Sequence, residues 1–337
     1  MTQTEITLET RCKNLITELD LGAADDVVAV QPLTGGVASD IAMIDLGDRR
    51  ICVKFALGKL KVAEDWYAPV HRNKAEYNWL KTAASILPET AIKLYGRSEV
   101  DNGFAMEYLD GSDVYLWKAA LLQAQPDKGE AADVGDVIGK IHASSAAPGF
   151  DVSPFQNRED FHALRLEPYL RFTATRHPAL AHRLNDLADM LYASNQVLVH
   201  GDVSPKNILF RAGKPIILDA ECATMGDASF DVAFCLNHLV LKAIHLPATR
   251  SVLLKAVEGF WKAYASHVDW EDPDALQARV CALLPMLMLA RVDGKSPVEY
   301  LSETDRQRVR DLAIPLIETP ETRLSAIVQK LTSHLER

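Results

Sequence analysis

The spacing of apolar residues changes near residue 110, from the alternation typical of strands to the three- and four-residue repeat typical of helices. Before this point, helices are predicted over residues 7–19 and 72–84. The alternating segments predict five strands, at residues 27–33, 40–46, 49–56, 91–99 and 104–109. Residues 110–113, with the sequence Asp-Gly-Ser-Asp, form the natural boundary after the last of these strands.

Helical periodicity dominates the rest of the chain, and one hairpin interrupts it. In this hairpin, the apolar runs at residues 208–210 and 215–218 flank a polar turn that contains Gly213. Pro315 and Pro320 are expected to interrupt the final helical region, because proline lacks the amide proton that a helix needs. Helices are predicted at residues 114–124, 128–146, 158–175, 179–194, 229–246, 249–268, 274–291, 304–314 and 321–336.

Strands followed by helices predict an α+β fold with two lobes. We expect a β-rich N-terminal lobe with a leading helix over residues 1–109, and a larger helical lobe that carries the hairpin over residues 110–337. A chain of 337 residues is long enough for two such domains and a substantial core.

Three polar side chains stand at the ends of the strands in the second lobe. Asp202 follows the apolar run at residues 197–199, Asn207 directly precedes the first hairpin strand, and Asp219 directly follows the second. We therefore expect these three residues to meet at one end of the hairpin. One carboxylate that accepts a hydroxyl proton, with an amide and a second carboxylate that hold Mg²⁺, is the set that phosphoryl transfer requires. Taken singly, each acid could equally be a turn or capping residue.

The spacing Asp-x-x-x-x-Asn, with a further Asp after a strand, matches a kinase catalytic loop and its metal-binding residue. Together with this spacing, the segments His200-Gly201-Asp202, Asn207, Asp219-Ala220-Glu221 and Gly226-Asp227 through Phe230-Asp231 make the chain resemble the aminoglycoside phosphotransferase and choline kinase family, which has a protein-kinase-like fold. The resemblance implies an ATP-dependent small-molecule kinase, with GTP as an alternative donor, in which Asp202 is catalytic and Asn207 and Asp219 hold Mg²⁺.

The connection between Asp219 and Asp227 is too short for a long activation loop, which favours a small acceptor over a protein. Asp227 and Asp231 are each expected to hydrogen-bond to the catalytic loop or to cap the next helix, and for Asp231 we expect capping. His142, within an apolar helix, is expected to be a packing or hydrogen-bonding residue rather than a catalytic one.

Lys54 lies in the predicted strand at residues 49–56, which resembles the kinase strand whose lysine binds the α- and β-phosphates. An exposed strand lysine would give the same local pattern. Glu76, on the helix over residues 72–84, is the best candidate to pair with Lys54, and Glu64 is the alternative. The loop that contains Gly35, Gly36 and Ser39 could approach phosphate groups as a nucleotide-covering loop does, although an ordinary tight turn explains it equally.

Residues 104–111 resemble the kinase hinge. The resemblance implies that Met106 lines the adenine pocket, and that the carbonyl of Glu107 and the amide of Leu109 bond to adenine. A strand that simply runs into a turn is the alternative.

Two further stretches are candidates for acceptor recognition. Residues 60–72 form a long connection similar to a Trp-containing insertion of methylthioribose kinases, or else a surface loop with anchoring aromatic residues. Residues 291–297 form a polar cluster after an apolar helix, and either cap that helix or line a cleft. Their mixed charge favours a polyhydroxylated or partly anionic acceptor, such as a sugar, at least as strongly as an amino alcohol or an aminoglycoside. The candidate acceptor ligands are Asp202, Glu221, Arg165, Arg291, Asp293, Lys295 and Trp66.

The composition of the chain limits its possible binding partners and indicates a cellular compartment. A net charge of −10 without a basic run argues against a nucleic-acid partner. The five cysteines are scattered and never form C-x-x-C, so we expect reduced thiols in a cytoplasmic protein and no zinc site. The longest apolar run, residues 280–290, is too short to cross a bilayer, and the first residues lack the features of a secretion signal.

The oligomeric state does not follow from the sequence. An inactive kinase fold that binds a ligand or a partner is the main functional alternative. The presence of Lys54, Asp202, Asn207 and Asp219 together favours an active enzyme.

Overall fold

The computed structural model describes residues 7–33, 39–59 and 69–336 of the chain. Gly35, Gly36, Glu64 and Trp66 lie outside these residues. The chain divides into two compact units, Met1–Gly111 and Ser112–Arg337, which are described separately.

The first unit contains an antiparallel five-stranded sheet, with the order β1-β2-β3-β5-β4. All five strands predicted from the alternating pattern are present. Their bounds are β1 Ala29–Pro32, β2 Ser39–Asp45, β3 Arg50–Ala56, β4 Leu94–Ser98 and β5 Gly103–Glu107.

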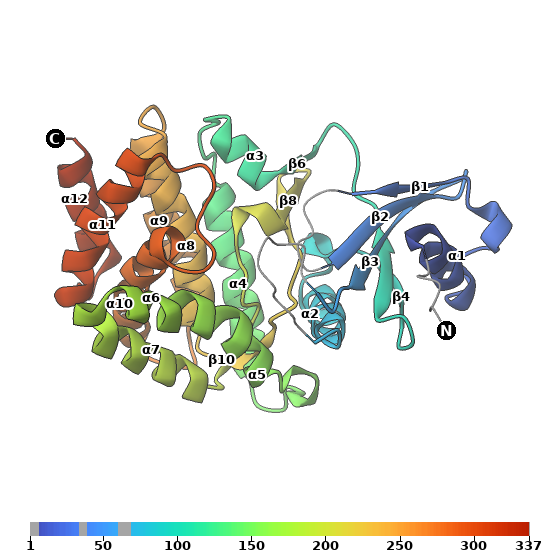
Figure 1. Ribbon diagram of the computed structural model, residues 1–337, viewed down its shortest axis with the longest axis horizontal. Coiled ribbons are helices and arrows are strands. Elements are labelled where there is room, and N and C mark those ends of the chain that lie inside the picture. The colour runs from blue at the N-terminus through green and yellow to red at the C-terminus, as the bar shows by residue number, and fades with distance from the viewer. Residues whose placement is uncertain (1–6, 34–38, 60–68, 337) are drawn as a thin grey trace. The chain divides into compact units, whose positions relative to one another are not determined.

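Two helices cover opposite faces of this sheet, α1 (Leu8–Glu18) and α2 (Arg72–Ile86) (Figure 1). An apolar core lies between α1 and the face of the sheet that it covers. In this core, Leu15 and Ile16 pack with Ile51, Val53 and Phe55. Because successive side chains in a strand point to opposite faces, Lys54 points away from this core. The alternation of β3 therefore places the lysine on the face that α2 covers.

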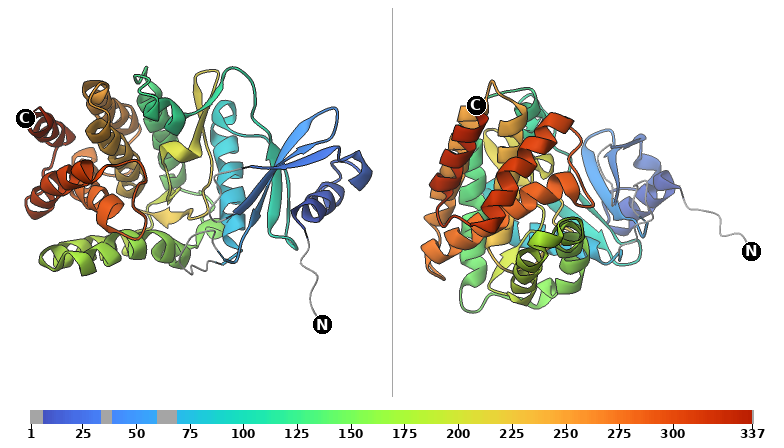
Figure 2. Two further views of the ribbon diagram at one scale, coloured as in Figure 1. Left: turned by 45° about the horizontal axis from the view of Figure 1, so that its top comes forward. Right: turned by 60° about the vertical axis from the view of Figure 1, so that its left-hand side comes forward.

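The second unit contains two small sheets among helices. The predicted hairpin is present as β8 (Ile208–Arg211) and β9 (Lys214–Ile217), and β6 (Val114–Leu116) adds a third strand to it. The strand β7 (Val197–Val199) pairs with β10 (Thr224–Gly226). The hairpin, yellow in Figure 2, packs through β9 against α4.

The helices of the second unit pack around α8, which is buried along nearly its whole length. The pairs α4–α9, α8–α9, α8–α10 and α10–α11 are in contact. The bounds are α3 Trp117–Leu122, α4 Glu130–Ala146, α5 Arg158–Phe161, α6 Phe172–Arg176, α7 Ala181–Ala193, α8 Ser229–His245, α9 Arg250–Ala265, α10 Pro273–Asp293, α11 Glu303–Glu318 and α12 Leu324–Leu335.

Three predicted elements differ from the structure. The helix predicted from residue 114 begins at Trp117, because residues 114–116 are β-prone and hydrogen-bond to β8. The helix α11 continues through Pro315 to Glu318, since Leu312, Leu316 and other apolar residues on both sides of the proline remain buried. The helical region from Arg158 to Arg176 contains a π-helical segment, His162–Arg171.

The apolar run at residues 280–290 belongs to the longer helix α10, Pro273–Asp293. Within the described residues, α10 alone has the length and hydropathy of a membrane-crossing helix. In the structure 78% of its most apolar window is buried inside the protein. The helices α8 and α11 both contact α10 and contribute to this burial.

Candidate active site

The loop that follows β7 has a backbone that requires glycine at one position. Gly201 has a φ of +81°, in the left-handed region, and a Cβ atom added there would lie 2.9 Å from the Cβ of Cys222. Both the dihedral angle and this close contact exclude a side chain. Glycine is therefore sterically required at the central position of His200-Gly201-Asp202.

A buried carboxylate holds this loop in place. Asp231 accepts hydrogen bonds from the amides of His200 (2.6 Å) and Gly201 (2.8 Å). Its Oδ2 atom also lies 3.3 Å from Nε2 of His142, whose Nδ1 is 2.9 Å from the hydroxyl of Tyr264. His142 is therefore a buried hydrogen-bonding residue, as expected.

The capping role expected for Asp231 is wrong. The amide at the beginning of α8, that of Ser229, donates instead to Asp227, at 2.9 Å. Asp231 also lies in the first turn of α8, but its carboxylate accepts from the amides of His200 and Gly201 rather than from an amide of its own helix.

The structure brings Asp202, Asn207 and Asp219 to one end of the hairpin. Nδ2 of Asn207 donates to the carbonyl oxygen of Asp202 (3.1 Å), and the amide of Leu218 donates to the carbonyl oxygen of Asn207 (2.9 Å). Asp219 follows Leu218 directly and has a φ of +70°, unusual for a residue with a side chain. A strained backbone of this kind is common at functional sites.

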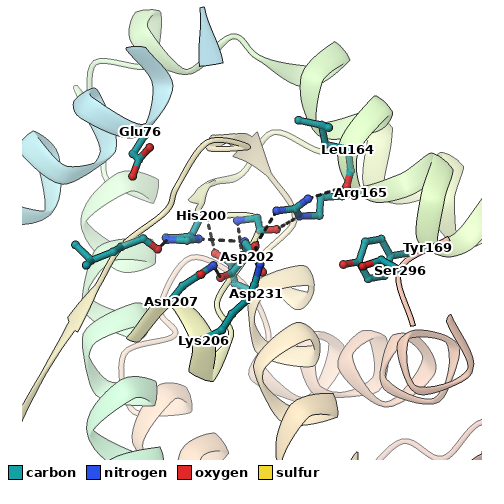
Figure 3. Close-up of polar contacts among 12 residues, drawn as sticks. Glu76, Leu164, Arg165, Tyr169, His200, Asp202, Lys206, Asn207, Asp231 and Ser296 are labelled. Atoms are coloured by element: carbon teal, nitrogen blue, oxygen red, sulfur yellow. Dashed lines mark hydrogen bonds and ion pairs between the residues drawn. The ribbon is translucent and has the colours of Figure 1, made fainter. Parts of the chain in front are cut away.

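Two cations flank the carboxylate of Asp202. Oδ2 of Asp202 lies 3.0 Å from Nη2 of Arg165 and 3.1 Å from Nζ of Lys206 (Figure 3). Burial by itself would raise the pKa of Asp202, but Lys206 and Arg165 outweigh it and lower this pKa below its ordinary value. Asp202 is therefore ionised at neutral pH and can accept a proton or a hydrogen bond.

His200 supports the loop in its neutral form. Burial lowers the pKa of His200 below its ordinary value. Its Nδ1 accepts a hydrogen bond from the amide of Asp202 at 3.0 Å, and its Nε2 lies 3.1 Å from the carbonyl oxygen of Leu218. The imidazole ring thereby links the loop after β7 to the end of β9.

Lys206 was not among the residues predicted from the sequence, and Arg165 was predicted as an acceptor ligand. Lys206 lies four residues after Asp202 in the same loop, which was the available signal. Arg165 was expected to contact the acceptor, whereas the structure places it on Asp202 and on the carbonyl oxygens of Leu164 and Gly201. It projects from the π-helical segment, and such segments often occur at functional sites.

Oxygen ligands for a divalent cation lie near this loop. A carboxylate oxygen of Asp219 lies within 4.8 Å of one of the buried Glu221. Asn207 uses its amide nitrogen toward Asp202 and has its carbonyl oxygen, Oδ1, as a further ligand atom. Carboxylate and amide oxygens are the donors that Mg²⁺ prefers, so the residues present fit this ion.

In the first unit, Nζ of Lys54 lies 2.7 Å from Oε2 of Glu76, and both side chains are buried. This is the pair expected from the sequence. In the strand register, Lys54 faces Phe104 and Cys52 faces Met106, so Met106 shares the face of the sheet on which Lys54 lies.

Three other predicted nucleotide ligands, Ser39, Glu107 and Leu109, lie in strands of the same sheet or just after one. β5 ends at Glu107, and Leu109 follows it. Ser39 is buried at the start of β2.

The polar cluster after α10 divides into separate contacts. Asp293 binds Arg310 (2.9 Å) and His177 (2.8 Å), so it joins α10 to α11 and to the segment after α6. Lys295 pairs with Glu167 at 3.0 Å and is partly exposed. Arg291 instead is buried, and its Nη1 lies 3.1 Å from the hydroxyl of Tyr169.

Comparison with known proteins gives a consistent result. Residues 29–278 match the family described as "Phosphotransferase enzyme family" (APH). A methylthioribose kinase of Pectobacterium atrosepticum is 24% identical over 324 residues, which cover 77% of this chain and 79% of that protein.

A choline kinase and an amicoumacin kinase are among the solved structures that resemble this one. The choline kinase of Cryptosporidium parvum has a TM-score of 0.55 with 14% identity, and covers 99% of this chain and 100% of its own. The amicoumacin kinase hAmiN, in complex with AMP-PNP, Ca²⁺ and Ami, has a TM-score of 0.54 with 14% identity, and covers 86% of this chain and 89% of its own. These likenesses confirm the predicted fold class, an α+β protein-kinase-like fold.

Proposed function

The chain belongs to the phosphotransferase enzyme family and is a small-molecule kinase, and from this premise we propose that it transfers the γ-phosphoryl group of ATP to a hydroxyl of its acceptor. The observation that carries the proposal is the grouping of Asp202, Asn207 and Asp219 at one end of the hairpin, with Asp202 held ionised. This set matches the requirements of phosphoryl transfer.

Asp202 orients the acceptor hydroxyl and accepts its proton. The acceptor oxygen forms a bond to the γ-phosphorus, the bond from that phosphorus to the β–γ bridging oxygen breaks, and ADP leaves with the electron pair. A carboxylate of low pKa suffices, because the transition state is loose and the proton leaves late. Arg165 and Lys206 hold the carboxylate in place, since both contact the same oxygen.

The residues of the first unit bind the nucleotide in this proposal. Lys54 contacts the α- and β-phosphates, and Glu76 fixes the position of Lys54 at 2.7 Å. Met106 lines the adenine pocket, and the main chain at Glu107 and Leu109 bonds to the base. Gly35, Gly36 and Ser39, the last of which is at the start of β2, are the proposed phosphate ligands before Lys54. The proposed donor is ATP; the amicoumacin kinase structure contains AMP-PNP.

Asn207 and Asp219 are the proposed ligands of Mg²⁺, with Glu221 as a further one. When bound, the ion neutralises charge on the phosphates and aligns them for transfer. The chain supplies the oxygen donors, and the φ of +70° at Asp219 sets the direction of its side chain.

A two-stage experiment tests this function. Melting is first measured with ATP, with and without Mg²⁺; then ADP release is followed with sugars, amino alcohols and aminoglycosides. We expect Mg²⁺-dependent stabilisation by ATP, and acceptor-dependent ADP release that Asp202→Ala abolishes. Stabilisation that ATP produces equally without Mg²⁺, with ADP release that no acceptor increases, would contradict the proposal.

A further inference from the structure

A group of cations lies in the second unit beside the candidate active site, and two of them have no carboxylate partner. Lys206 pairs with Asp202, and Lys118 pairs with Glu299. Among the residues that the structure describes, Lys242 and Arg291 form no ion pair, although Lys242 is 1% exposed and Arg291 9% exposed. Buried charges of this kind are normally paired.

The hydrogen bonds of these two residues are also incomplete. Nζ of Lys242 has one distant contact, the carbonyl oxygen of His238 at 3.5 Å, and it lies 5.0 Å from the centre of the Tyr300 ring. Arg291 uses Nη1 toward Tyr169 and Ser296. Its buried Nε has no hydrogen-bond partner in the described part of the chain, and the buried hydroxyl of Tyr300 has none either.

The pKa values of Lys242 and His238 reflect the positive charge of this group. Burial, then Lys118 and Arg291, lowers the pKa of Lys242 to about 7. Burial, then Arg291 and Lys242, holds the pKa of His238 well below its ordinary value. The cations therefore repel one another, and Glu299, which pairs with Lys118, offsets this repulsion only in part.

The group adjoins the catalytic carboxylate. The ring of Phe234 lies 5.5 Å from the ring of His238 and 6.0 Å from the guanidinium of Arg165, which binds Asp202. Tyr169, which receives the Arg291 hydrogen bond, also packs on Phe234, at 5.5 Å. Figure 3 shows Tyr169 and Ser296 together on the side of Arg165 that faces away from His200.

From these contacts we propose that the acceptor carries an oxyanion, a carboxylate or a phosphate, which Lys242, Arg291 and the hydroxyl of Tyr300 bind. An oxyanion supplies the acceptor atoms that the unpartnered donors lack, and it neutralises the two unpaired charges. The same acceptor presents its hydroxyl to Asp202. This inference rests on the proposed function for the transfer step, but the anion site itself does not depend on it.

The test uses inorganic phosphate and acetate as probes, at equal ionic strength against chloride, with AMP-PNP and Mg²⁺ present. It is carried out at pH 6.5, where Lys242 is mostly protonated. Melting temperature is measured for the wild type, Lys242→Met and a matched control, Lys140→Met. Lys140 is partly exposed and pairs with Asp136 at 2.7 Å on its own helix.

We expect phosphate or acetate to raise the melting temperature of the wild type and of Lys140→Met, and to have at least tenfold weaker affinity for Lys242→Met. The probe that raises the melting temperature more, phosphate or acetate, indicates whether the oxyanion of the acceptor is a phosphate or a carboxylate. Without any probe, Lys242→Met should melt higher than the wild type, because the variant buries no unpaired charge. An equal response of the wild type and Lys242→Met, or no response in either, would overturn the anion site.

A catalytic comparison then links the site to the acceptor. ADP release is measured with D-ribose, D-ribonate and D-ribose 5-phosphate, which differ mainly in their charge. For any anionic acceptor that the wild type phosphorylates, Lys242→Met should raise the KM for that acceptor at least tenfold, and Lys140→Met should leave it unchanged. If phosphate binding depends on Lys242 but no hydroxyl compound is phosphorylated, the proposed function fails and the anion site stands. Equal KM values for anionic acceptors in the wild type and Lys242→Met would overturn the link to the acceptor.

Discussion

Arg165 and Asp202, which are far apart in the sequence, form an ion pair with 3.0 Å between Nη2 and Oδ2. The arginine also donates to the carbonyl oxygen of Gly201, the residue directly before Asp202. It thus fixes the backbone and the carboxylate of the catalytic loop from outside that loop. In the proposed mechanism, Arg165 is a positioning residue that acts through Asp202.

Replacing this arginine should change the pH profile of the reaction. In Arg165→Met, one of the two cations that lower the pKa of Asp202 is lost, so that pKa rises. The ionised carboxylate is the active form, and activity is lost as the pH falls through its pKa. We therefore expect the acidic limb of kcat/KM to move to higher pH by about 1 unit, and kcat to fall by about tenfold or more.

A nearby arginine provides the control. Arg171 lies in the same π-helical segment and pairs with the exposed Asp189 at 2.6 Å. Arg171→Met should leave the pH profile unchanged. An identical shift in both variants would show that the segment, rather than the contact to Asp202, sets the profile.

Removing the carboxylate of Asp202 should affect turnover and spare nucleotide binding. We expect Asp202→Ala to lower kcat by about 10²- to 10⁴-fold, as for the loss of a general base, with little change in ATP affinity. Single-turnover rates and nucleotide titration by fluorescence measure the two effects separately. A parallel loss of ATP affinity would place Asp202 among the metal ligands.

The glycine of the catalytic loop should tolerate alanine less well than a glycine of the hairpin turn. Gly201 and Gly213 both have positive φ angles, +81° and +74°, so alanine at either position is strained by about 1–2 kcal/mol. An added Cβ meets Cys222 at 2.9 Å only at residue 201, since nothing lies within 4 Å of it at residue 213. Denaturant unfolding should show a clearly larger loss of stability for Gly201→Ala, which should also lose activity. Equal losses would mean that the contact relaxes freely.

Asp231 should control the order of the catalytic loop. Asp231→Asn removes the negative charge that accepts two amide hydrogen bonds, and we expect a loss of about 2–3 kcal/mol in stability. Hydrogen exchange at the amides of His200 and Gly201 is the specific measurement. Both amides should exchange faster in the variant; unchanged exchange there would show that other contacts hold the loop.

The stability of the protein should rise with pH in the alkaline range because of Lys242. Burial, Lys118 and Arg291 lower the pKa of this lysine from 10.5 to about 7, so between these values the unfolded chain holds a proton that the folded chain does not. The free energy of unfolding then increases with pH by up to a few kcal/mol over this range. Cys235 and Glu299 oppose the shift but do not cancel it.

Lys242→Met should remove this dependence. Urea unfolding of the wild type and the variant at pH 7 and pH 9.5 checks it, with Lys140→Met as the reference for a partly exposed lysine. A slope that persists in Lys242→Met would assign the effect to other titrating groups.

Local sequence was sufficient for much of the fold and for the centre of the site. Lys54 was predicted in a strand and Glu76 on the following helix, and their side chains form the expected pair. The hairpin fixed the positions of Asn207 and Asp219, because residues that flank two paired strands must lie together. These predictions succeeded because strand alternation and hairpin pairing are short-range geometry.

The partners of these residues were decided by tertiary packing. Arg165 reaches Asp202 from a π-helical segment, and Asp231 reaches the catalytic loop from α8, across separations that no local pattern encodes. The strand at residues 114–116 forms because β8 offers an edge for it, and the burial of Lys242 depends on the helices packed around α8. The sequence by itself determined which residue types stand at the ends of the strands. Only the tertiary structure decided which charges face one another, because burial and long-range contact set both their pairing and their pKa values.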